Sequence, residues 1–121
     1  MYPSFQEVID CLSVVEAPAK PLPSKRAAVS ISLRSGVSGP EILMIQRAVR
    51  EGDPWSGHMG FPGGRKDASD ATDVACAKRE TREEISFDLD TYGELVCQLS
   101  DVNTGWRTDR PEMLVAPFIF R

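Results

Sequence analysis

The first periodic pattern of apolar residues lies near the N-terminus and has the spacing of a helix. Four apolar residues recur there at intervals of three and four: Phe5, Val8, Ile9 and Leu12. Ser4 stands three residues before Glu7, which is the spacing of a capping box at the start of a helix. The pattern predicts an amphipathic helix within residues 1–16. The proline-rich stretch APAKPLPSK, residues 17–25, then predicts a connector.

Runs of strand-forming residues follow the connector and recur at the C-terminal end. Residues 27–33 and 41–47 are separated by RSGVSGP, whose glycines and proline favour a turn between two strands. Residues 94–102 and 112–121 are rich in β-branched and aromatic residues and are separated by a polar loop. The pattern therefore predicts a hairpin early in the chain and two strands late in it, on either side of a different middle segment.

The middle segment combines a glycine turn with a helical pattern. Pro62, Gly63 and Gly64 interrupt regular structure, because proline lacks a backbone donor and glycine permits positive φ and close backbone approach, so we expect a sharp loop after Phe61. Residues 71–85 contain no glycine or proline and consist largely of helix-forming residues. We expect Asp70 to cap this helix, with an ion pair to Arg79 as the alternative.

The predicted helix has a packing face and an adjoining acidic face. The packing face contains Val74, Ala77, Thr81 and Ile85, and the acidic face contains Glu80, Glu83 and Glu84. Like charges at positions i and i+4, close to the negative end of the helix dipole, oppose helix stability. A bound Mg²⁺ would reverse this effect, since it prefers carboxylate oxygens. The alternative is a solvated face of ion pairs, with Arg79 bound to Glu83.

Composition indicates one globular domain without a basic surface. The chain has 121 residues, a formal net charge of -4 and a pI near 5.0, so we expect no DNA partner. The three cysteines, Cys11, Cys76 and Cys97, form no metal-binding spacing, and we expect reduced, buried thiols. No apolar run is long enough to span a membrane, and no signal peptide is recognisable. We expect an intracellular protein, cytoplasmic by default, and the pattern leaves the mitochondrion and the peroxisome open.

The middle segment resembles the Nudix box. Gly64 matches the first glycine of that box, and RETREEISF matches its end through the Arg-Glu-x-x-Glu-Glu core of Arg79, Glu80, Glu83 and Glu84. Three departures are present: Asp70 stands for the first glutamate, eight residues rather than seven separate it from Arg79, and Ser86 replaces the last glycine. The core that binds metal in the family is intact.

The resemblance implies a fold, a cofactor and a set of ligands. The fold is an α/β/α sandwich with a mixed β-sheet and a loop–helix–loop catalytic motif, in a Nudix hydrolase domain over residues 26–121. The cofactor is Mg²⁺ or Mn²⁺. By resemblance Glu80 and Glu84 are direct ligands, Glu83 is a further ligand or the base, and the Gly63 carbonyl is a backbone ligand. Arg79 orients the acids. Such a centre hydrolyses a diphosphate.

Four further residues are candidates for substrate binding or catalysis. Arg47 and Arg65 are placed to meet phosphates, although a surface ion pair explains either one equally well. Trp106 lies in a loop where an adenine could stack on it. The alternative is that Trp106 packs on the core. Glu112 is a candidate general base, because some members of the family supply one from outside the box, and a salt bridge to a nearby arginine is the alternative.

The segment before the box resembles the coenzyme A diphosphatase branch of the family and leaves three functions open. Leu43, Arg47, Ala48, Gly57 and Phe61 fit that branch, whereas Asp53 stands where the branch has a second arginine. The first function is metal-dependent hydrolysis of a small-molecule diphosphate, a nucleoside diphosphate linked to another moiety, with a coenzyme A-like substrate favoured. The second is a nucleotide- or RNA-binding regulatory module with little turnover. The third is a protein-interaction subunit.

The third function depends on two predicted apolar surfaces. A homodimer or a protein partner would bind through the N-terminal helix or through a face of the sheet left uncovered after the last strand. Family members usually continue with a helix at that point. The resemblance therefore implies either a fragment or another cover for that face.

Overall fold

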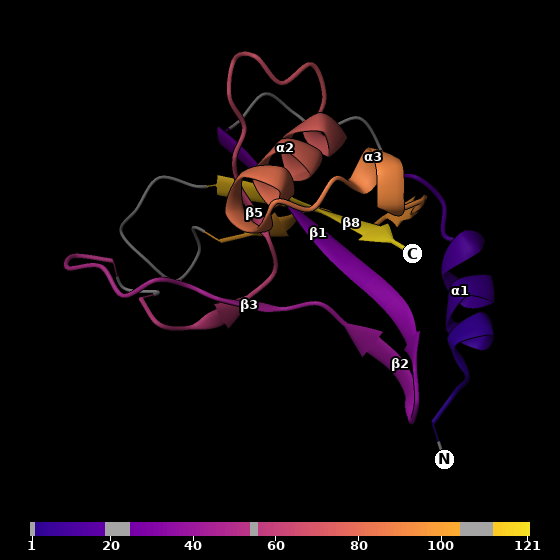
Figure 1. Ribbon diagram of the computed structural model, residues 1–121. Helices are drawn as coiled ribbons and strands as arrows, with labels where there is room; N and C mark the ends of the chain where they lie inside the picture. Colours follow the sequence, from indigo (N-terminus) through magenta and orange to yellow (C-terminus); the bar gives the residue numbers. More distant parts are fainter. Residues whose placement is uncertain (1, 19–24, 54–55, 105–112) are drawn as a thin grey trace.

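The structure of the protein is a computed structural model that describes residues 2–18, 25–53, 56–104 and 113–121 (Figure 1). The elements of the described residues are, in chain order, α1 (Phe5–Ser13), β1 (Lys25–Gly36), β2 (Gly39–Ile42), β3 (Ile45–Gln46), β4 (Met59–Gly60), β5 (Gly63–Arg65), α2 (Asp73–Ile85), α3 (Leu89–Tyr92), β6 (Leu95–Gln98), β7 (Val102–Asn103) and β8 (Met113–Phe120). No helix among them is both long and apolar enough to cross a membrane.

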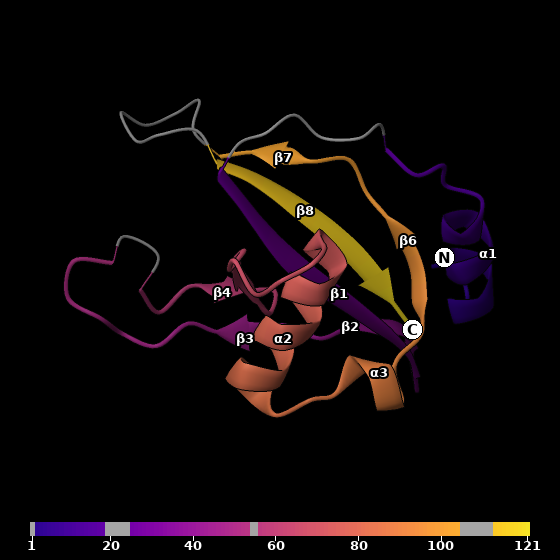
Figure 2. The ribbon, with the colours of Figure 1, turned by 90° about the horizontal axis from the view of Figure 1, so that it is seen from above.

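The main sheet is mixed, as the resemblance implies. Its strand order is β2-β1-β8-β6, with β5 paired to β1 and β7 paired to β8. The long strands β1 and β8 are parallel, in a register from Lys25 opposite Met113 to Ser32 opposite Phe120. The other pairs in this sheet are antiparallel. Figure 2 shows β8 lying along β1, with β6 and β7 on its other side.

The four predicted strands are confirmed in outline, and two of them are corrected in extent. The early hairpin is β1 with β2, but β2 ends at Ile42, and the segment that follows pairs as β3 with β4 in a separate small sheet. The late strand over residues 94–102 is divided into β6 and β7. The strand β8 is present as predicted. The short helix α3 has no counterpart in the prediction, because four residues carry too little periodicity to be recognised.

The glycine segment is a strand, which corrects the predicted loop. Residues Gly63–Arg65 form β5 and pair antiparallel with residues 27–29 of β1. A Cβ added to Gly63 would lie 2.3 Å from the carbonyl oxygen of Ala28, so only glycine allows β5 to approach β1 so closely. Neither Gly63 nor Gly64 has a positive φ. The glycines therefore serve close packing here and not a turn.

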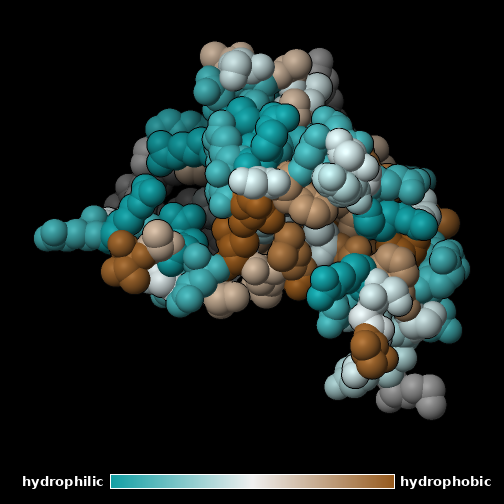
Figure 3. All heavy atoms as spheres, in the orientation of Figure 1, coloured by the Kyte–Doolittle hydropathy of each residue, from teal (hydrophilic) through white to brown (hydrophobic). Residues whose placement is uncertain are grey.

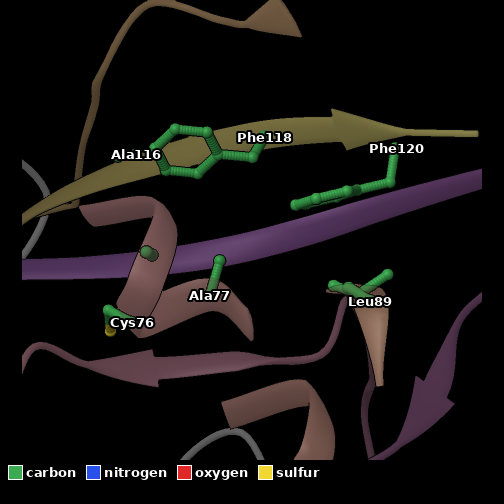
Figure 4. Close-up of a cluster of buried hydrophobic side chains, with 7 residues drawn as sticks. Cys76, Ala77, Leu89, Ala116, Phe118 and Phe120 are labelled. Atoms are coloured by element: carbon green, nitrogen blue, oxygen red, sulfur yellow. The ribbon is translucent and has the colours of Figure 1, made fainter. Parts of the chain in front are cut away.

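One face of the sheet packs against α2 and α3. Its buried cluster, shown in Figure 4, takes alternate residues of β8 together with residues of β1, α2 and α3: Ala28, Cys76, Ala77, Leu89, Ala116, Phe118 and Phe120. The alternation follows from the two-residue period of a strand. The predicted packing face of α2 is confirmed, because Ala77 and Thr81 are fully buried and Val74 packs against the cluster.

The opposite face of the sheet packs against α1. The helix has the predicted capping box, with reciprocal bonds between Ser4 and Glu7. Its four apolar residues pack against Leu33, Cys97 and Ile119 of three strands. This corrects the prediction that the apolar face of the N-terminal helix binds a partner, because that face is occupied within the chain. With α1 on one side and α2 on the other, the layers are those of the predicted sandwich (Figure 1).

The cysteines are free thiols in different environments. Cys76 and Cys97 are buried, as predicted, and Cys11 on α1 is exposed, which corrects the expectation for that residue. Cys11 falls on the solvent side of α1 because it lies outside the apolar stripe of that helix.

A buried pair of hydroxyl groups joins β1 to α2. The Ser30 and Thr81 side chains are fully buried, and their oxygens lie 2.7 Å apart. Thr81 Oγ1 donates its one hydrogen to the Ala77 carbonyl, also at 2.7 Å, so the Ser30 hydroxyl is the donor between the pair. Thr81 occupies a position where the Nudix box has an apolar residue, and Ser30 supplies the polar partner that makes threonine acceptable there.

This geometry predicts an asymmetric effect of substitution on stability. Thr81→Val should lower the free energy of unfolding by about 1–3 kcal/mol, because it leaves the buried Ser30 hydroxyl without an acceptor. Adding Ser30→Ala to Thr81→Val should recover part of that loss, since it removes the unsatisfied donor. Urea unfolding of both single variants and the double variant measures the coupling. A double variant no more stable than Thr81→Val would contradict the assignment.

Candidate active site

The acidic helix begins two residues later than predicted and is capped by a different residue. Helix α2 runs over Asp73–Ile85, and the Thr72 hydroxyl accepts a hydrogen bond from the Ala75 amide at 3.1 Å. The prediction that Asp70 caps this helix is wrong. Asp70 instead accepts a backbone bond from Asp67 and binds Arg79.

Arg79 is the centre of the acidic face. Its Nε and Nη2 donate to the two carboxylate oxygens of Asp70 at 2.9 and 2.8 Å, a bidentate pair. Its Nη1 donates to Glu80 and to Glu83, each at 3.1 Å. Its Nη2 also donates to the Arg65 carbonyl at 3.2 Å. The ion pair predicted between Arg79 and Glu83 is therefore present, within a larger network that ties α2 to the end of β5.

The Asp70 carboxyl is held ionised by this network. The hydrogen bonds from Arg79 lower its pKa to about 2, against the effect of burial, which would raise it. The nearby Cys76 thiol has a pKa raised to about 11, first by burial and then by the negative charge of Asp70. Cys76 is thus a neutral thiol that packs under the network, and its Sγ donates to the Gly64 carbonyl at 3.5 Å.

The strand β5 lies directly against the acidic helix. A Cβ added to Gly64 would lie 2.6–2.7 Å from the carboxyl atoms of Glu80. Any side chain at residue 64 would therefore displace this carboxylate. Gly64 and Glu80 both belong to the segment that resembles the Nudix box and lie sixteen residues apart in the sequence. The structure brings them close together, because the absence of a side chain at Gly64 leaves space for the Glu80 carboxylate.

Glu84 lies in a field of like charges. Its pKa is raised, first by burial of the carboxyl group and then by the charges of Glu80 and Glu83. The Gly63 backbone and the positive charge of Arg47 act in the opposite direction. Glu84 is exposed as a whole residue, so this burial is only partial. The three glutamates and Arg47 consequently belong to one electrostatic neighbourhood.

A cleft of about 450 Å³ opens beside these glutamates. It is lined by Glu83 and Glu84 of α2 and, in the segment after β3, by Arg47, Arg50 and Asp53. Arg47 donates to Asp53 at 3.0 Å. The structure thus brings Arg47 to the box glutamates although they are far apart in sequence. The predicted role of Arg47 in substrate binding stays a prediction. The alternative to that role was a surface ion pair, and the structure contains one, between Arg47 and Asp53.

A larger cavity, of about 760 Å³, lies away from the acidic face. It is lined by residues of β2, α3 and the ends of β1 and β8, and contains none of the box glutamates. Exposed apolar residues border it, including Ile42, Met44 and Tyr92. Figure 3 shows apolar atoms gathered in the region between β3 and β2, whereas polar atoms cover α2. We place the candidate active site at the smaller cleft, because the titratable groups gather there.

Helix α2 ends at a residue in the left-handed conformation. Ser86 has φ 56° and ψ 30°, and its amide donates to the Arg82 carbonyl at 2.9 Å. The Nudix box has glycine at this position, and glycine adopts this conformation without strain. Ser86 therefore adopts a conformation that suits glycine, and its backbone is strained as a result.

Ser86→Gly should stabilise the protein by about 1 kcal/mol, because the left-handed conformation is strained for any residue with a Cβ. Ser100→Gly is a matched control at an exposed serine whose φ is not positive, and it should be neutral or destabilising. Urea unfolding of the two variants tests the difference. Equal effects would show that Ser86 is not strained.

A second buried ion network fixes the start of α2 and had no signal in the sequence. Arg26 of β1 donates to Asp73 at 2.9 Å and, through both terminal nitrogens, to Asp101 at 3.0 and 2.9 Å. Burial alone would raise the pKa of Asp73, but Arg26 and Lys66 outweigh it and the pKa is lowered. The network joins Arg26 to two residues that lie 47 and 75 positions later in the chain. Local patterns could not reveal it.

Two predicted site residues, Trp106 and Glu112, lie outside the described residues. Arg65 is exposed at the end of β5, and its backbone carbonyl, rather than its side chain, contacts the acidic network. The predicted roles of these three residues stay predictions, as does the Gly63 carbonyl as a ligand.

The acidic face fits a hard divalent cation by chemistry but is not arranged for one. The donors are carboxylate oxygens, which Mg²⁺ and Mn²⁺ prefer, and the space left by Gly64 holds the Glu80 carboxylate beside β5. However, no three His, Cys, Asp or Glu side chains of the described part of the chain converge as a ready metal site. Arg79 binds both Glu80 and Glu83 in this arrangement.

Comparison with known proteins identifies the family of the chain. Residues 24–120 match the NUDIX domain model. The chain is 38% identical over 86 residues to the uncharacterised protein C14C4.10c of Schizosaccharomyces pombe, which covers 69% of this chain and 26% of that protein. It is 39% identical over 71 residues to the uncharacterised Nudix hydrolase NudL of Klebsiella aerogenes, which covers 57% of this chain and 56% of that protein. The chain belongs to the NUDIX family.

Solved structures share the fold at low sequence identity. An Ap4A hydrolase of C. elegans has a TM-score of 0.62 and 17% identity, covering 81% of this chain and 67% of that one. The NrtR protein of Shewanella oneidensis, in a complex with a 27mer DNA, has a TM-score of 0.57 and 20% identity, covering 78% of this chain and 40% of that one. Because a protein with this fold is found with DNA, the expected absence of a DNA partner stays a prediction.

Proposed function

We propose that the protein hydrolyses the diphosphate bond of a nucleoside diphosphate linked to another moiety, with a divalent cation at the acidic face of α2. The close approach of Gly64 to the Glu80 carboxylate carries the proposal, because it sets one acid of the helix against the preceding strand, while Glu83 and Glu84 of the same helix line the cleft. Nudix hydrolases act with divalent cations, and relatives of this chain bear that name. Mg²⁺ or Mn²⁺ is the proposed cation.

Each residue of the acidic face has a proposed role in this reaction. Glu80 and Glu84 would hold the cation, and Glu83 would join them or serve as the base on leaving Arg79. When bound, the cation neutralises phosphate oxygens and lowers the pKa of water. Water attacks one phosphorus, the bridging bond to the other phosphate breaks, and a carboxylate accepts the proton of the water. Arg79 holds the acids in place from its bidentate pair with Asp70.

A coenzyme A-like substrate is the finer proposal. It is supported by the segment before the box, which brings Arg47 into the cleft beside Glu83 and Glu84. The Ap4A hydrolase that shares the fold supports, by analogy, the broader class of nucleotides joined through phosphates. Since the chain spans 26% of the length of one curated relative and 56% of another, the activity of the whole protein is part of the proposal.

A nucleotide-binding module with little turnover is the second candidate. The observation that favours it is that Arg79 Nη1 binds both Glu80 and Glu83, so that these acids already have a positive partner in the described structure. This candidate uses the same cleft and requires no bound cation.

Turnover of a substrate panel distinguishes the two candidates. The panel contains coenzyme A, ADP-ribose, NADH and diadenosine tetraphosphate, each assayed with Mg²⁺, with Mn²⁺ and with EDTA. We expect metal-dependent release of two phosphorylated products from at least one of them, and none in EDTA. Binding of a nucleotide without hydrolysis under every metal condition would favour the module with little turnover.

A further inference from the structure

The cleft beside α2 has walls of opposite charge. Glu83 and Glu84 form the acidic wall, which the proposed function assigns to a cation. Arg47 and Arg50 lie on the facing wall, after β3. A volume of about 450 Å³ is sufficient for part of a nucleotide, since small-molecule sites occupy about 300–1,000 Å³. The basic wall takes no part in the bond cleavage proposed above, and Arg50 has been given no role so far.

The segment that carries the two arginines is closed on itself by hydrogen bonds. The Arg47 amide donates to the His58 carbonyl at 2.8 Å, and the Gly57 amide donates to the Arg47 carbonyl at 3.2 Å. The Arg50 amide donates to the Ser56 hydroxyl at 2.6 Å. The described residues 47–50 are therefore tied to residues 56–58. The segment presents both arginines from a defined backbone.

The two arginines differ in their partners. Arg47 is paired with Asp53, whose side chain is 20% exposed. The Arg50 guanidinium has no ion pair among the described residues. Asp53 and Glu84 both act on the charge of Arg47, whereas no ion pair joins Arg50 to a described acidic side chain. The donor groups of the Arg50 guanidinium are therefore not taken up by an acid of the described residues, and a phosphate is a suitable acceptor for them.

We propose that Arg50 and Arg47 form an anion subsite for a phosphate group of the substrate that lies outside the diphosphate bond being cut, and that Asp53 competes with this phosphate for Arg47. The inference rests on the proposed function and adds a substrate class to it: substrates with three or more phosphates in all. Arginine suits this task because its planar donor groups bind phosphate in a bidentate manner. The scissile diphosphate itself would lie toward the acidic wall.

Binding of inorganic tripolyphosphate in EDTA tests the subsite without the metal and without turnover. Under these conditions the acidic wall repels the anion, so binding depends on the basic wall. By calorimetry at low salt, we expect Arg50→Gln to weaken binding about fivefold or more, the effect of one unit charge at contact distance in water. Asp53→Asn should tighten binding by a similar factor. Arg34→Gln, which removes an exposed arginine paired with Glu41 outside the cleft, should leave it unchanged.

Kinetics then separate the failure of this inference from the failure of the proposed function. With metal, Arg50→Gln should raise KM for diadenosine tetraphosphate or coenzyme A at least fivefold, and should leave KM for ADP-ribose, which has two phosphates, within twofold. A wild-type protein that hydrolyses none of them contradicts the proposed function, while the tripolyphosphate result still judges the subsite. Arg50→Gln that binds tripolyphosphate like the wild type, or Asp53→Asn that binds it more weakly, overturns the subsite.

Discussion

Glu84→Gln lowers turnover of the diphosphate substrate by about 10²–10⁴-fold, a loss as large as that of a catalytic acid or base, because it removes a proposed ligand of the cation that neutralises the phosphates and activates water. The same substitution should leave the metal-free protein as stable as before, or more stable by about 0.2–0.5 kcal/mol. The reason is that it removes a like charge from Glu80 at the i, i+4 spacing, the repulsion that helps to raise the pKa of Glu84.

Steady-state turnover with metal and thermal unfolding in EDTA measure the two effects of Glu84→Gln. Glu94→Gln is a matched control, because Glu94 is an exposed glutamate at a distance, in a loose pair with Arg121 at 3.6 Å. The control should retain turnover. Retained turnover in Glu84→Gln, or a loss of activity explained by unfolding, would remove Glu84 from the proposed centre.

Asp70→Asn should lower the free energy of unfolding by about 3 kcal/mol and should also lower turnover, because it breaks a buried ion pair and releases Arg79 from its fixed position. Asparagine caps helices about as well as aspartate, so a capping role would have predicted almost no effect. Asp67→Asn, in the same segment but exposed, is the control and should change both quantities little.

The pH dependence of stability gives an independent reading of the same pair. Because the pKa of Asp70 falls to about 2 in the folded protein, its stabilisation is fully present above the unfolded pKa, near 4, and is lost as the pH falls from about 4 to 2. The wild type should therefore lose stability over this range more steeply than Asp70→Asn. Parallel curves for the two proteins would contradict the lowered pKa.

The features predicted correctly from the sequence are those with a local pattern. The spacing of apolar residues predicted α1, the spacing of Ser4 and Glu7 predicted its capping box, and the abundance of strand-forming residues predicted β8. The two faces of α2 followed from its helical period. In each case the residues that define the element also form its contacts, so that spacing alone was informative.

The errors arise where a contact between distant residues decides the local structure. Asp70 and Thr72 are both good capping residues, and Thr72 is the cap because Asp70 binds Arg79, nine residues away. The strand β5 has almost no side chains to signal it, and its glycines are required by the backbone of β1 instead. A sequence pattern contains neither kind of information.

The acidic face of the site was predicted from the Nudix box, whereas the basic wall of the cleft was only partly foreseen. Arg47 was a candidate, but Arg50 and the pairing of Asp53 with Arg47 became visible only when the loop was seen to close beside α2. The branch of the family that the segment resembles has an arginine where Asp53 stands. The structure gives this departure a physical meaning, since the aspartate moderates the charge of its neighbour.

The central claim is that the acidic face of α2 holds a divalent cation, and Mn²⁺ binding tests it most directly. Electron paramagnetic resonance measures the free Mn²⁺ that remains as protein is added. We predict that the wild type lowers the free Mn²⁺ signal. The double variant Glu80→Gln/Glu84→Gln should leave this signal close to that of buffer, and a thermal unfolding curve should verify that the variant is folded. A wild type that leaves the free signal unchanged, or a double variant that binds Mn²⁺ as tightly as the wild type, would contradict the account.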